Sequence, residues 1–268
     1  MATPNVLVLT GYGINCDRET KHAFELAGAK GELVHINDLI ADPAALNKYQ
    51  MLAFPGGFSY GDDTGAGNAL ADKIKNQMWG ELLRFIEEKK LAIGICNGFQ
   101  VMVNLGILPA LEGYGKREAA LVHNDSARYT DRWVDIEFPP ESIESPWTKG
   151  LGSIRVPIAH GEGKFYAAPE TLIRITLEGL VAAKYCRGEV CRMQKFPTNP
   201  NGSLENIASI TDPTGRLIGM MPHPERAVMF TQLPYWTLLK EQLKREGKPI
   251  PEYGDGLKVF QNAVEYFK

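Results

Sequence analysis

The segment of residues 91–100, Leu-Ala-Ile-Gly-Ile-Cys-Asn-Gly-Phe-Gln, constrains the fold of this chain more than any other. Its apolar first half predicts a buried parallel strand, and the Gly-x-Cys-x-Gly spacing that follows predicts a sharp turn into a helix. Small residues beside Cys96 let the backbone turn tightly and leave the thiol protruding. A helix beginning just after Cys96 favours the thiolate through its positive N-terminal end. We therefore predict that Cys96 is a covalent nucleophile, with the amide N–H of Asn97 free to bind an oxyanion.

The first hundred residues alternate between strand and helix patterns, which indicates a parallel sheet covered by helices. Strands are expected at residues 5–10, 32–36, 51–54 and 91–95, and helices at residues 17–27, 79–90 and 99–104. The middle of the chain changes character. Short strands expected at residues 133–138, 154–157, 172–177 and 181–186 predict an antiparallel extension of the sheet.

The last part of the chain predicts a hairpin and two helices. Residues 207–211 and 217–221 flank the turn sequence Asp212-Pro-Thr-Gly215, and the helices are expected at residues 235–246 and 256–267. Since the sequence has no internal repeat, low-complexity tract or long linker, we predict one domain over residues 1–268, with a helical extension over about 233–268.

Composition excludes several classes of function. The hydrophobic fraction of 44% and the charged fraction of 23% are ordinary for a globular protein. A net charge of −3 gives no electrostatic case for binding nucleic acid or a membrane surface. No apolar run approaches the roughly 20 residues of a membrane span, and the N-terminus has no signal-peptide pattern. Four cysteines do not suggest a disulfide scaffold, so we expect a reducing, cytoplasmic location.

A catalytic cysteine needs a histidine to move protons and a third group to orient that histidine. Of the five histidines, only His223 has a carboxylate at a suitable offset, in Met221-Pro-His-Pro-Glu225. Pro224 holds His223 extended, and residues two apart in an extended segment project to the same side. We therefore expect Glu225 beside the ring of His223. A surface turn bracketed by prolines is the alternative.

A second oxyanion donor is expected from the glycine pair at residues 56 and 57. Gly56 and Gly57 follow the predicted strand 51–54, and adjacent glycines let the backbone approach a substrate closely. An ordinary glycine-rich connection between strand and helix is equally compatible with this segment.

Three motifs, in this order, resemble a class I (triad) glutamine amidotransferase: Pro-Gly-Gly at 55–57, Gly-Ile-Cys-Asn-Gly-Phe-Gln at 94–100 and His-Pro-Glu at 223–225. Residues 13–19, 57–62, 157–163, 199–203 and 221–226 narrow the resemblance to the glutaminase subunits of phosphoribosylformylglycinamidine synthase, which acts in purine biosynthesis. The resemblance extends from residue 5 to about residue 230. It implies a flavodoxin-like α/β fold, with a mostly parallel sheet, helices on both faces and a small antiparallel extension.

The resemblance also implies a role for each matching residue. Cys96 is the expected nucleophile, His223 the proton carrier and Glu225 its orienting partner. The expected oxyanion and substrate-binding groups are Gly56, Gly57, Asn97 and Gln100.

The implied activity is hydrolysis of glutamine to glutamate and ammonia through a cysteinyl thioester. The ammonia would pass to a large ATP-dependent synthase subunit, in a complex with a small assembly subunit. ATP and magnesium are expected on that large partner, because this chain has no Gly-x-x-x-x-Gly-Lys phosphate loop. No cofactor and no metal are expected in this chain.

Several alternatives stay open. The chain could be another cysteine hydrolase or peptidase on the same architecture, or a non-catalytic assembly subunit. His160, which precedes Glu162 in a glycine-flanked loop, could replace His223 as base, although the family suggests a role in a substrate loop or an interface. Residues 123–126 could touch glutamine or form a polar loop, and the segment 63–67 departs from the sequence of many bacterial members.

Two weaker sequence patterns give little support for a cofactor site or a metal site. Residues 11–16 only faintly match a dinucleotide-binding fingerprint, because Cys16 replaces the third glycine. Cys186 and Cys191 lack a second Cys/His pair, so we expect buried thiols rather than a metal site.

Overall fold

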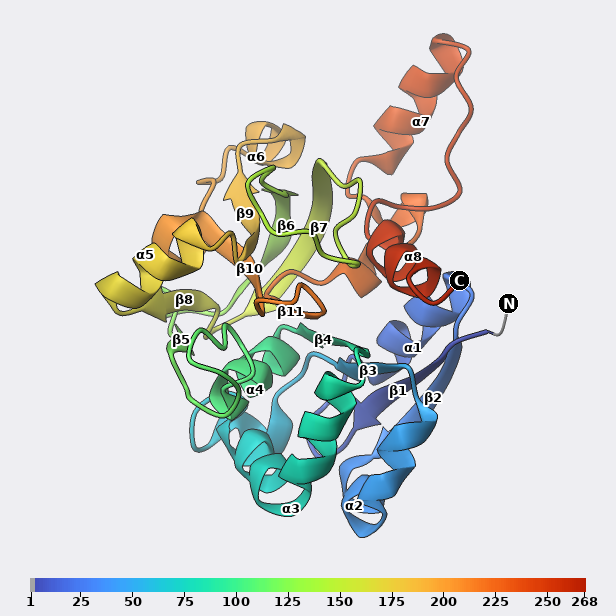
Figure 1. The fold of residues 1–268 in the computed structure, drawn as a ribbon. Coiled ribbons are helices and arrows are strands. Elements are labelled where there is room, and N and C mark those ends of the chain that lie inside the picture. Colours follow the sequence, from blue (N-terminus) through green and yellow to red (C-terminus); the bar gives the residue numbers. More distant parts are fainter. Residues whose placement is uncertain (1–2) are drawn as a thin grey trace.

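The computed structural model describes residues 3–268, and a nine-stranded mixed sheet forms its centre (Figure 1). The order of strands across this sheet is β2-β1-β3-β4-β11-β10-β9-β6-β7. A separate two-stranded sheet pairs β5 with β8. The strands are β1 (Asn5–Thr10), β2 (Lys30–His35), β3 (Met51–Phe54), β4 (Leu91–Ile95), β5 (Ala119–Val122), β6 (Thr130–Glu137), β7 (Ser153–His160), β8 (Lys164–Ala167), β9 (Val181–Cys186), β10 (Ile207–Thr211) and β11 (Leu217–Met220).

One half of the sheet is parallel and the other antiparallel. Strands β2, β1, β3, β4 and β11 run parallel, whereas β10, β9, β6 and β7 continue the sheet antiparallel. Every residue of β3, β4 and β11 is buried, as expected for parallel strands covered on both faces. The carboxyl ends of β3, β4 and β11 therefore meet at one edge of the sheet, where ligand sites of such sheets lie.

Helices cover both faces of the parallel half. Figure 1 shows α1 and α8 on one side and α3 and α4 on the other. The rings of Phe24 in α1 and Phe260 in α8 meet edge to face at 4.9 Å between centroids. The helices are α1 (Asp17–Leu26), α2 (Ile36–Ala41), α3 (Asn68–Glu87), α4 (Asn97–Leu105), α5 (Pro169–Leu177), α6 (Glu189–Gln194), α7 (Trp236–Arg245) and α8 (Leu257–Glu265).

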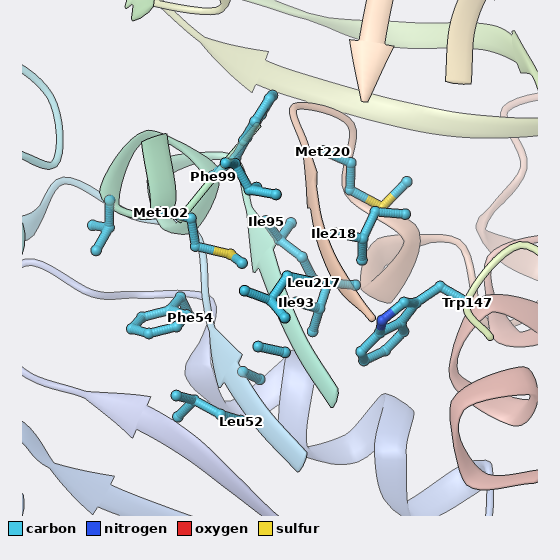
Figure 2. Close-up of a cluster of buried hydrophobic side chains, with 14 of the residues drawn as sticks. Leu52, Phe54, Ile93, Ile95, Phe99, Met102, Trp147, Leu217, Ile218 and Met220 are labelled. Atoms are coloured by element: carbon cyan, nitrogen blue, oxygen red, sulfur yellow. The ribbon is translucent and has the colours of Figure 1, made fainter. Parts of the chain in front are cut away.

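Near the turn at Cys96, buried side chains pack α4 against β4 and β11 (Figure 2). Phe99 and Met102 of α4 are fully buried, as are Ile93 of β4 and Ile218 of β11. Each such side chain contributes about 1.5–3 kcal/mol through burial. The start of α4 is therefore fixed relative to the ends of β4 and β11.

The expected parallel strands, the strand-to-helix turn at residue 96 and the hairpin near the C-terminus are confirmed. Three of the expected middle strands are also confirmed, since β6, β7 and β9 pair antiparallel. The strand expected at 172–177 is wrong, because these residues belong to α5. Alternating apolar and polar residues with β-branched side chains favoured a strand, but Pro169 and Glu170 start a helix that buries Ile175.

Some element boundaries also differ. The second strand ends at His35, and Ile36 already begins α2. The helix expected over 79–90 begins at Asn68 and ends at Glu87, with a kink at Met78. Strands β5 and β8 and helices α2 and α6 are present although no such elements were expected.

The two expected terminal helices are present but differ in their surroundings. Helix α8 packs on α1, whereas α7 projects from the body of the protein and has no buried residue (Figure 1). Within residues 3–268, no helix combines the length and apolar character that crossing a membrane requires.

Candidate active site

Cys96 occupies the sharp turn between β4 and α4. Its backbone has φ 52° and ψ −106°, a conformation that is strained for a residue with a side chain. The flanking glycines make the turn possible. A Cβ atom on Gly94 would lie 2.5 Å from the carbonyl oxygen of Gly98, and one on Gly98 would lie 1.8 Å from that of Phe54. The Gly-x-Cys-x-Gly spacing is therefore required by the close crossing of α4 over β3 and β4.

His223 follows β11, at the start of a 3-10 turn over Pro224–Arg226. Its backbone N–H donates to the carbonyl oxygen of Pro157 in β7 at 2.8 Å. The Nδ1 atom of its ring lies 2.6 Å from an oxygen of Glu225, and both side chains are buried. The expected pairing of His223 with Glu225 is therefore present.

Cys96 and His223 meet because they leave neighbouring parallel strands at the same edge. Ile95 of β4 is in register with Met220 of β11, and the N–H of Cys96 donates to the carbonyl oxygen of Met220 at 2.8 Å. Gly56, after β3, lies beneath both residues. A Cβ atom there would be 2.8 Å from Cε1 of His223 and 3.4 Å from Cβ of Cys96. Three adjacent strands thus bring Gly56, Cys96 and His223 together.

The surroundings of His223 favour the imidazolium. Burial by itself would lower the pKa of His223, but the charge of Glu225 and contacts with nearby cysteine sulfurs outweigh it and raise this pKa well above its ordinary value. The Nε2 atom has no hydrogen-bond partner within residues 3–268, and Cys96 and Cys16 line the same small cavity as His223. A charged His223 beside Cys96 forms the acid of a thiol–imidazole pair.

A pocket of about 290 Å³ opens on Cys96. The candidate residues Gly57 and Gln100 line it. Further lining residues, to which the sequence analysis gave no role, are Phe58, Gly61, Asp62, Tyr129, Ala159, Gly161 and Glu162. A larger cavity, of about 580 Å³, lies between residues 144–150 and α8 and contains no cysteine or histidine. Size alone therefore does not identify the reactive site.

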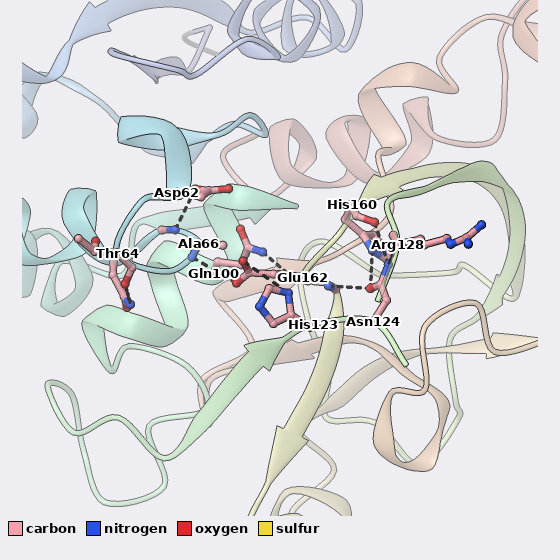
Figure 3. Close-up of polar contacts among 12 residues, drawn as sticks. Asp62, Thr64, Ala66, Gln100, His123, Asn124, Arg128, His160 and Glu162 are labelled. Carbon is pink, nitrogen blue, oxygen red and sulfur yellow. Dashed lines mark hydrogen bonds and ion pairs between the residues drawn. The ribbon is translucent and has the colours of Figure 1, made fainter. Parts of the chain in front are cut away.

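Hydrogen bonds tie the pocket wall together (Figure 3). The side-chain amide of Gln100 donates to the carbonyl oxygen of Glu162 at 2.6 Å. The carboxylate of Glu162 in turn accepts from the N–H of Ala66 at 3.3 Å. Gln100 thus joins α4 to the loop after β7, and the segment 63–67 closes the same wall.

Asp62 lies in the same network. The side chain of Asn97 donates to Asp62 at 3.1 Å and to Gln100 at 2.9 Å. Burial raises the pKa of Asp62, and the charge of Glu162 adds to this increase. The pocket therefore holds two neighbouring carboxyl groups, Asp62 and Glu162.

The two expected oxyanion donors lie at Cys96. Asn97 is the first residue of α4, and the first N–H groups of a helix have no partner within it. Gly57 lines the pocket and has φ 148°, and a Cβ atom there would lie 2.5 Å from the carbonyl oxygen of Gly13. Asn97 and Gly57 thus both lie beside Cys96.

His160 has a different setting from His223. Its Nδ1 lies 3.1 Å from the side-chain oxygen of Asn124, and Glu162 contacts Ala66 and His123 instead. Burial, followed by the charge of His223, lowers the pKa of His160 to about 3. His160 is therefore neutral, is hydrogen-bonded to an amide and lines the pocket, and this setting does not suit the base of a triad.

The other candidates lie apart from the reacting groups. Residues 123–126 do not line the pocket at Cys96; His123 is 81% exposed, while Asn124 is buried against His160. Cys186 and Cys191 are unpaired thiols, and Cys191 contacts the carbonyl oxygen of Cys186 at 3.7 Å.

Two residues for which no role was expected also contact the site. Cys16 faces His223, and Arg226 donates to the sulfur of Cys16 at 2.9 Å. Both belong to motifs that carry the family resemblance, residues 13–19 and 221–226, which is the signal that could have identified them.

A mostly parallel α/β sheet with a cysteine at one strand end and a histidine–glutamate pair at the next defines the class as a triad-type glutamine amidotransferase. The family model of the CobB/CobQ-like glutamine amidotransferase domain matches residues 3–267. Curated relatives are phosphoribosylformylglycinamidine synthase subunits PurQ. The protein from Methanococcus maripaludis is 50% identical, over 98% of this chain and 97% of its own. That from Dehalococcoides mccartyi is 42% identical, over 99% and 98%.

A solved structure is also similar. A chain in the structure of PurLQS from Thermotoga maritima is 30% identical, covers 100% of both chains and has a TM-score of 0.72. The chain described here belongs to the CobB/CobQ-like glutamine amidotransferase family and, within it, to the PurQ subunits. Since the Methanococcus relative is matched over nearly its full length, the C-terminal segment is not peculiar to this chain.

Proposed function

We propose that this chain is the glutaminase subunit of phosphoribosylformylglycinamidine synthase. The observation that carries the proposal is the convergence of Cys96 with the buried His223–Glu225 pair, where Cys96 also lines a pocket of about 290 Å³. The names of the relatives support the same assignment.

The chemistry of the pocket suits glutamine. Its volume is at the small end of the range for ligand pockets, which fits an amino acid. The carboxyl groups of Asp62 and Glu162 complement the α-ammonium group of the substrate. The side-chain amide then points toward the thiol of Cys96.

The reaction is an acyl transfer in two stages. The Cys96 thiolate attacks the amide carbon, and the oxyanion is held by the N–H groups of Gly57 and Asn97. One such donor contributes on the order of 3 kcal/mol to transition-state stabilisation. The imidazolium of His223 then gives its proton to the leaving nitrogen, so that ammonia departs and a glutamyl thioester remains.

In the second stage His223, now neutral, removes a proton from water. The resulting hydroxide attacks the thioester carbon, glutamate leaves, and the proton on His223 restores the thiolate–imidazolium pair. Glu225 keeps the Nδ1 proton of His223 in place during both stages.

The ammonia passes, in this proposal, to a large ATP-dependent synthase subunit that converts formylglycinamide ribonucleotide to the amidine. ATP and magnesium belong to that subunit, and a small third subunit helps assembly. The PurLQS name of the similar structure supports partner subunits in general. We further propose a single amidotransferase domain with a C-terminal helical extension, and a cytoplasmic location, which suits the four free cysteines.

The test is to reconstitute the complex with Cys96→Ala and supply either glutamine or an ammonium salt. We expect the variant to lose the glutamine-dependent reaction and keep the ammonium-dependent one. Cys186→Ser is the matched control and should keep both. Undiminished use of glutamine by Cys96→Ala would exclude Cys96 as nucleophile, and hydrolysis of peptides by the wild-type chain would favour a peptidase.

A further inference from the structure

A second cysteine, Cys16, lies against the ring of His223. It caps the N-terminus of α1, where its N–H donates to the carbonyl oxygen of Gly56 at 3.1 Å and its own carbonyl oxygen accepts from Thr20. A Cβ atom on Gly56 would be 3.0 Å from the sulfur of Cys16 and 2.8 Å from Cε1 of His223. The fold thus fixes this thiol at the imidazole.

The sulfur of Cys16 is held by polar groups on its other sides. Arg226 donates to it at 2.9 Å, and the thiol donates to the side-chain oxygen of Asn15 at 3.2 Å. Glu19 of α1 holds the guanidinium of Arg226 at 3.0 Å. Cys16 is only 1% exposed, so these contacts are made inside the protein.

A cavity of about 30 Å³ joins these groups to the reacting pair. Asn15, Cys16 and Arg226 line it together with Cys96 and His223. The Nε2 atom of His223 is buried without a hydrogen-bond partner among residues 3–268, and a ring nitrogen of His223 lies within 4.8 Å of the sulfur of Cys16. Glu225 occupies the other ring nitrogen.

We propose that Cys16 and Arg226 form a positioning pair that holds the imidazole of His223 toward Cys96. Glu225 constrains the ring at Nδ1, and the sulfur of Cys16, which lies within 4.8 Å of a ring nitrogen and of the Glu225 carboxylate, packs against the ring. Arg226 donates a hydrogen bond to that sulfur and so keeps it in place. The role deepens the proposed glutaminase function and depends on it.

The pair has a distinct use once Cys96 is acylated. A thioester sulfur carries no charge and no longer attracts the imidazole, whereas the sulfur of Cys16 is chemically unchanged at that stage. The packing of Cys16 against the ring therefore persists while Nε2 of His223 takes a proton from water. Cys16 forms no bond to substrate in this role.

The test compares Cys16→Ala and Cys16→Ser in the reconstituted complex, with glutamine hydrolysis followed as a function of pH. We expect Cys16→Ala to lower kcat about tenfold, as misplacement of a catalytic group does, and to leave KM within about twofold. The basic limb of kcat/KM should move to lower pH, because the contact with Cys16 helps raise the pKa of His223. Cys16→Ser should recover most of kcat, since a hydroxyl also accepts from Arg226.

Two further variants complete the experiment. Arg226→Met should change kcat and the pH profile in the same direction as Cys16→Ala, and it tests the pair if Cys16→Ala does not fold. Cys191→Ser, a buried cysteine outside the site, is the control and should leave both unchanged. Wild-type kcat and pH profile in folded Cys16→Ala would overturn the positioning role alone. A wild-type complex that hydrolyses no glutamine would instead overturn the proposed function.

Discussion

The Nδ1 atom of His223 and the Oε1 atom of Glu225 lie 2.6 Å apart, and their side chains are 1% and 0% exposed. A hydrogen bond between charged groups this far from water is stronger than one between neutral groups. It fixes the proton on Nδ1 and leaves Nε2, which has no hydrogen-bond partner within residues 3–268, available for proton transfer. The proton transfers of the reaction therefore depend on the buried carboxylate of Glu225.

Replacing this carboxylate by an amide should impair catalysis without removing the contact altogether. We expect Glu225→Gln to lower kcat for glutamine by about a hundredfold or more, within the range that general acid–base groups contribute. The basic limb of kcat/KM should also move to lower pH, because the charge of Glu225 raises the pKa of His223. Rates measured across pH with Glu241→Gln, an exposed residue of α7, as control would test this. A wild-type rate in Glu225→Gln would contradict it.

Gly56 must lack a side chain, because the imidazole of His223 occupies that space. A methyl group on Gly56 would lie 2.8 Å from Cε1 of His223, so we expect Gly56→Ala to lower kcat by about a hundredfold. Gly80→Ala is a matched control, since a Cβ atom there meets nothing within 4 Å. Because Gly80 lies inside α3, its replacement should stabilise the protein by about 1 kcal/mol. Thermal unfolding and glutamine kinetics of both variants give the comparison.

The acidic end of the pocket should contribute to glutamine binding. Glu162→Gln removes the charge and keeps an oxygen that can accept from Ala66, so we expect KM for glutamine to rise about tenfold. The ammonium-dependent reaction should not change. Equal loss in both reactions would indicate a structural defect instead.

His160 should make the protein sensitive to acid. Its pKa is lowered to about 3 in the folded state, so folding favours the neutral ring. The stability that His160 contributes is therefore full above about pH 6.5, its unfolded value, and is lost as pH falls toward 3; the loss reaches about 2 kcal/mol by pH 5.

Denaturant unfolding at pH 7 and pH 5 measures this effect. The free energy of unfolding of His160→Gln should fall between the two pH values by about 2 kcal/mol less than that of the wild type. His22→Gln, which removes an exposed histidine of α1, should behave as the wild type does. Equal pH dependence in wild type and His160→Gln would show that His160 is not held neutral.

Local patterns were enough to predict the elements that carry the candidate triad. Gly94 and Gly98 have no room for side chains, and Pro224 begins the 3-10 turn that follows His223, so the sequence itself encodes both turns. A strand was wrongly expected at residues 172–177, because alternation of apolar and polar residues and β-branched side chains also occur on a helix surface. In α5, Ile173 is 57% and Leu177 80% exposed.

The rest of the site depends on contacts between distant segments. Cys16 meets His223 only because β1, β3, β4 and β11 lie in a particular order, which no local pattern states. Likewise, the hydrogen bond from the side chain of Gln100 to the backbone of Glu162 joins residues that are 62 positions apart in the chain. Such roles follow from tertiary structure alone.

The most direct test of the central claim is labelling with a glutamine analogue that carries an electrophilic ketone at the position of the amide. Peptide mass spectrometry of the treated full-length chain would identify the modified cysteine. We expect about one equivalent on Cys96, slowed by added glutamine, before any modification of Cys16, Cys186 or Cys191. Preferential labelling of another cysteine, or labelling of Cys96 that glutamine does not slow, would contradict the assignment of Cys96 as the nucleophile of a glutaminase.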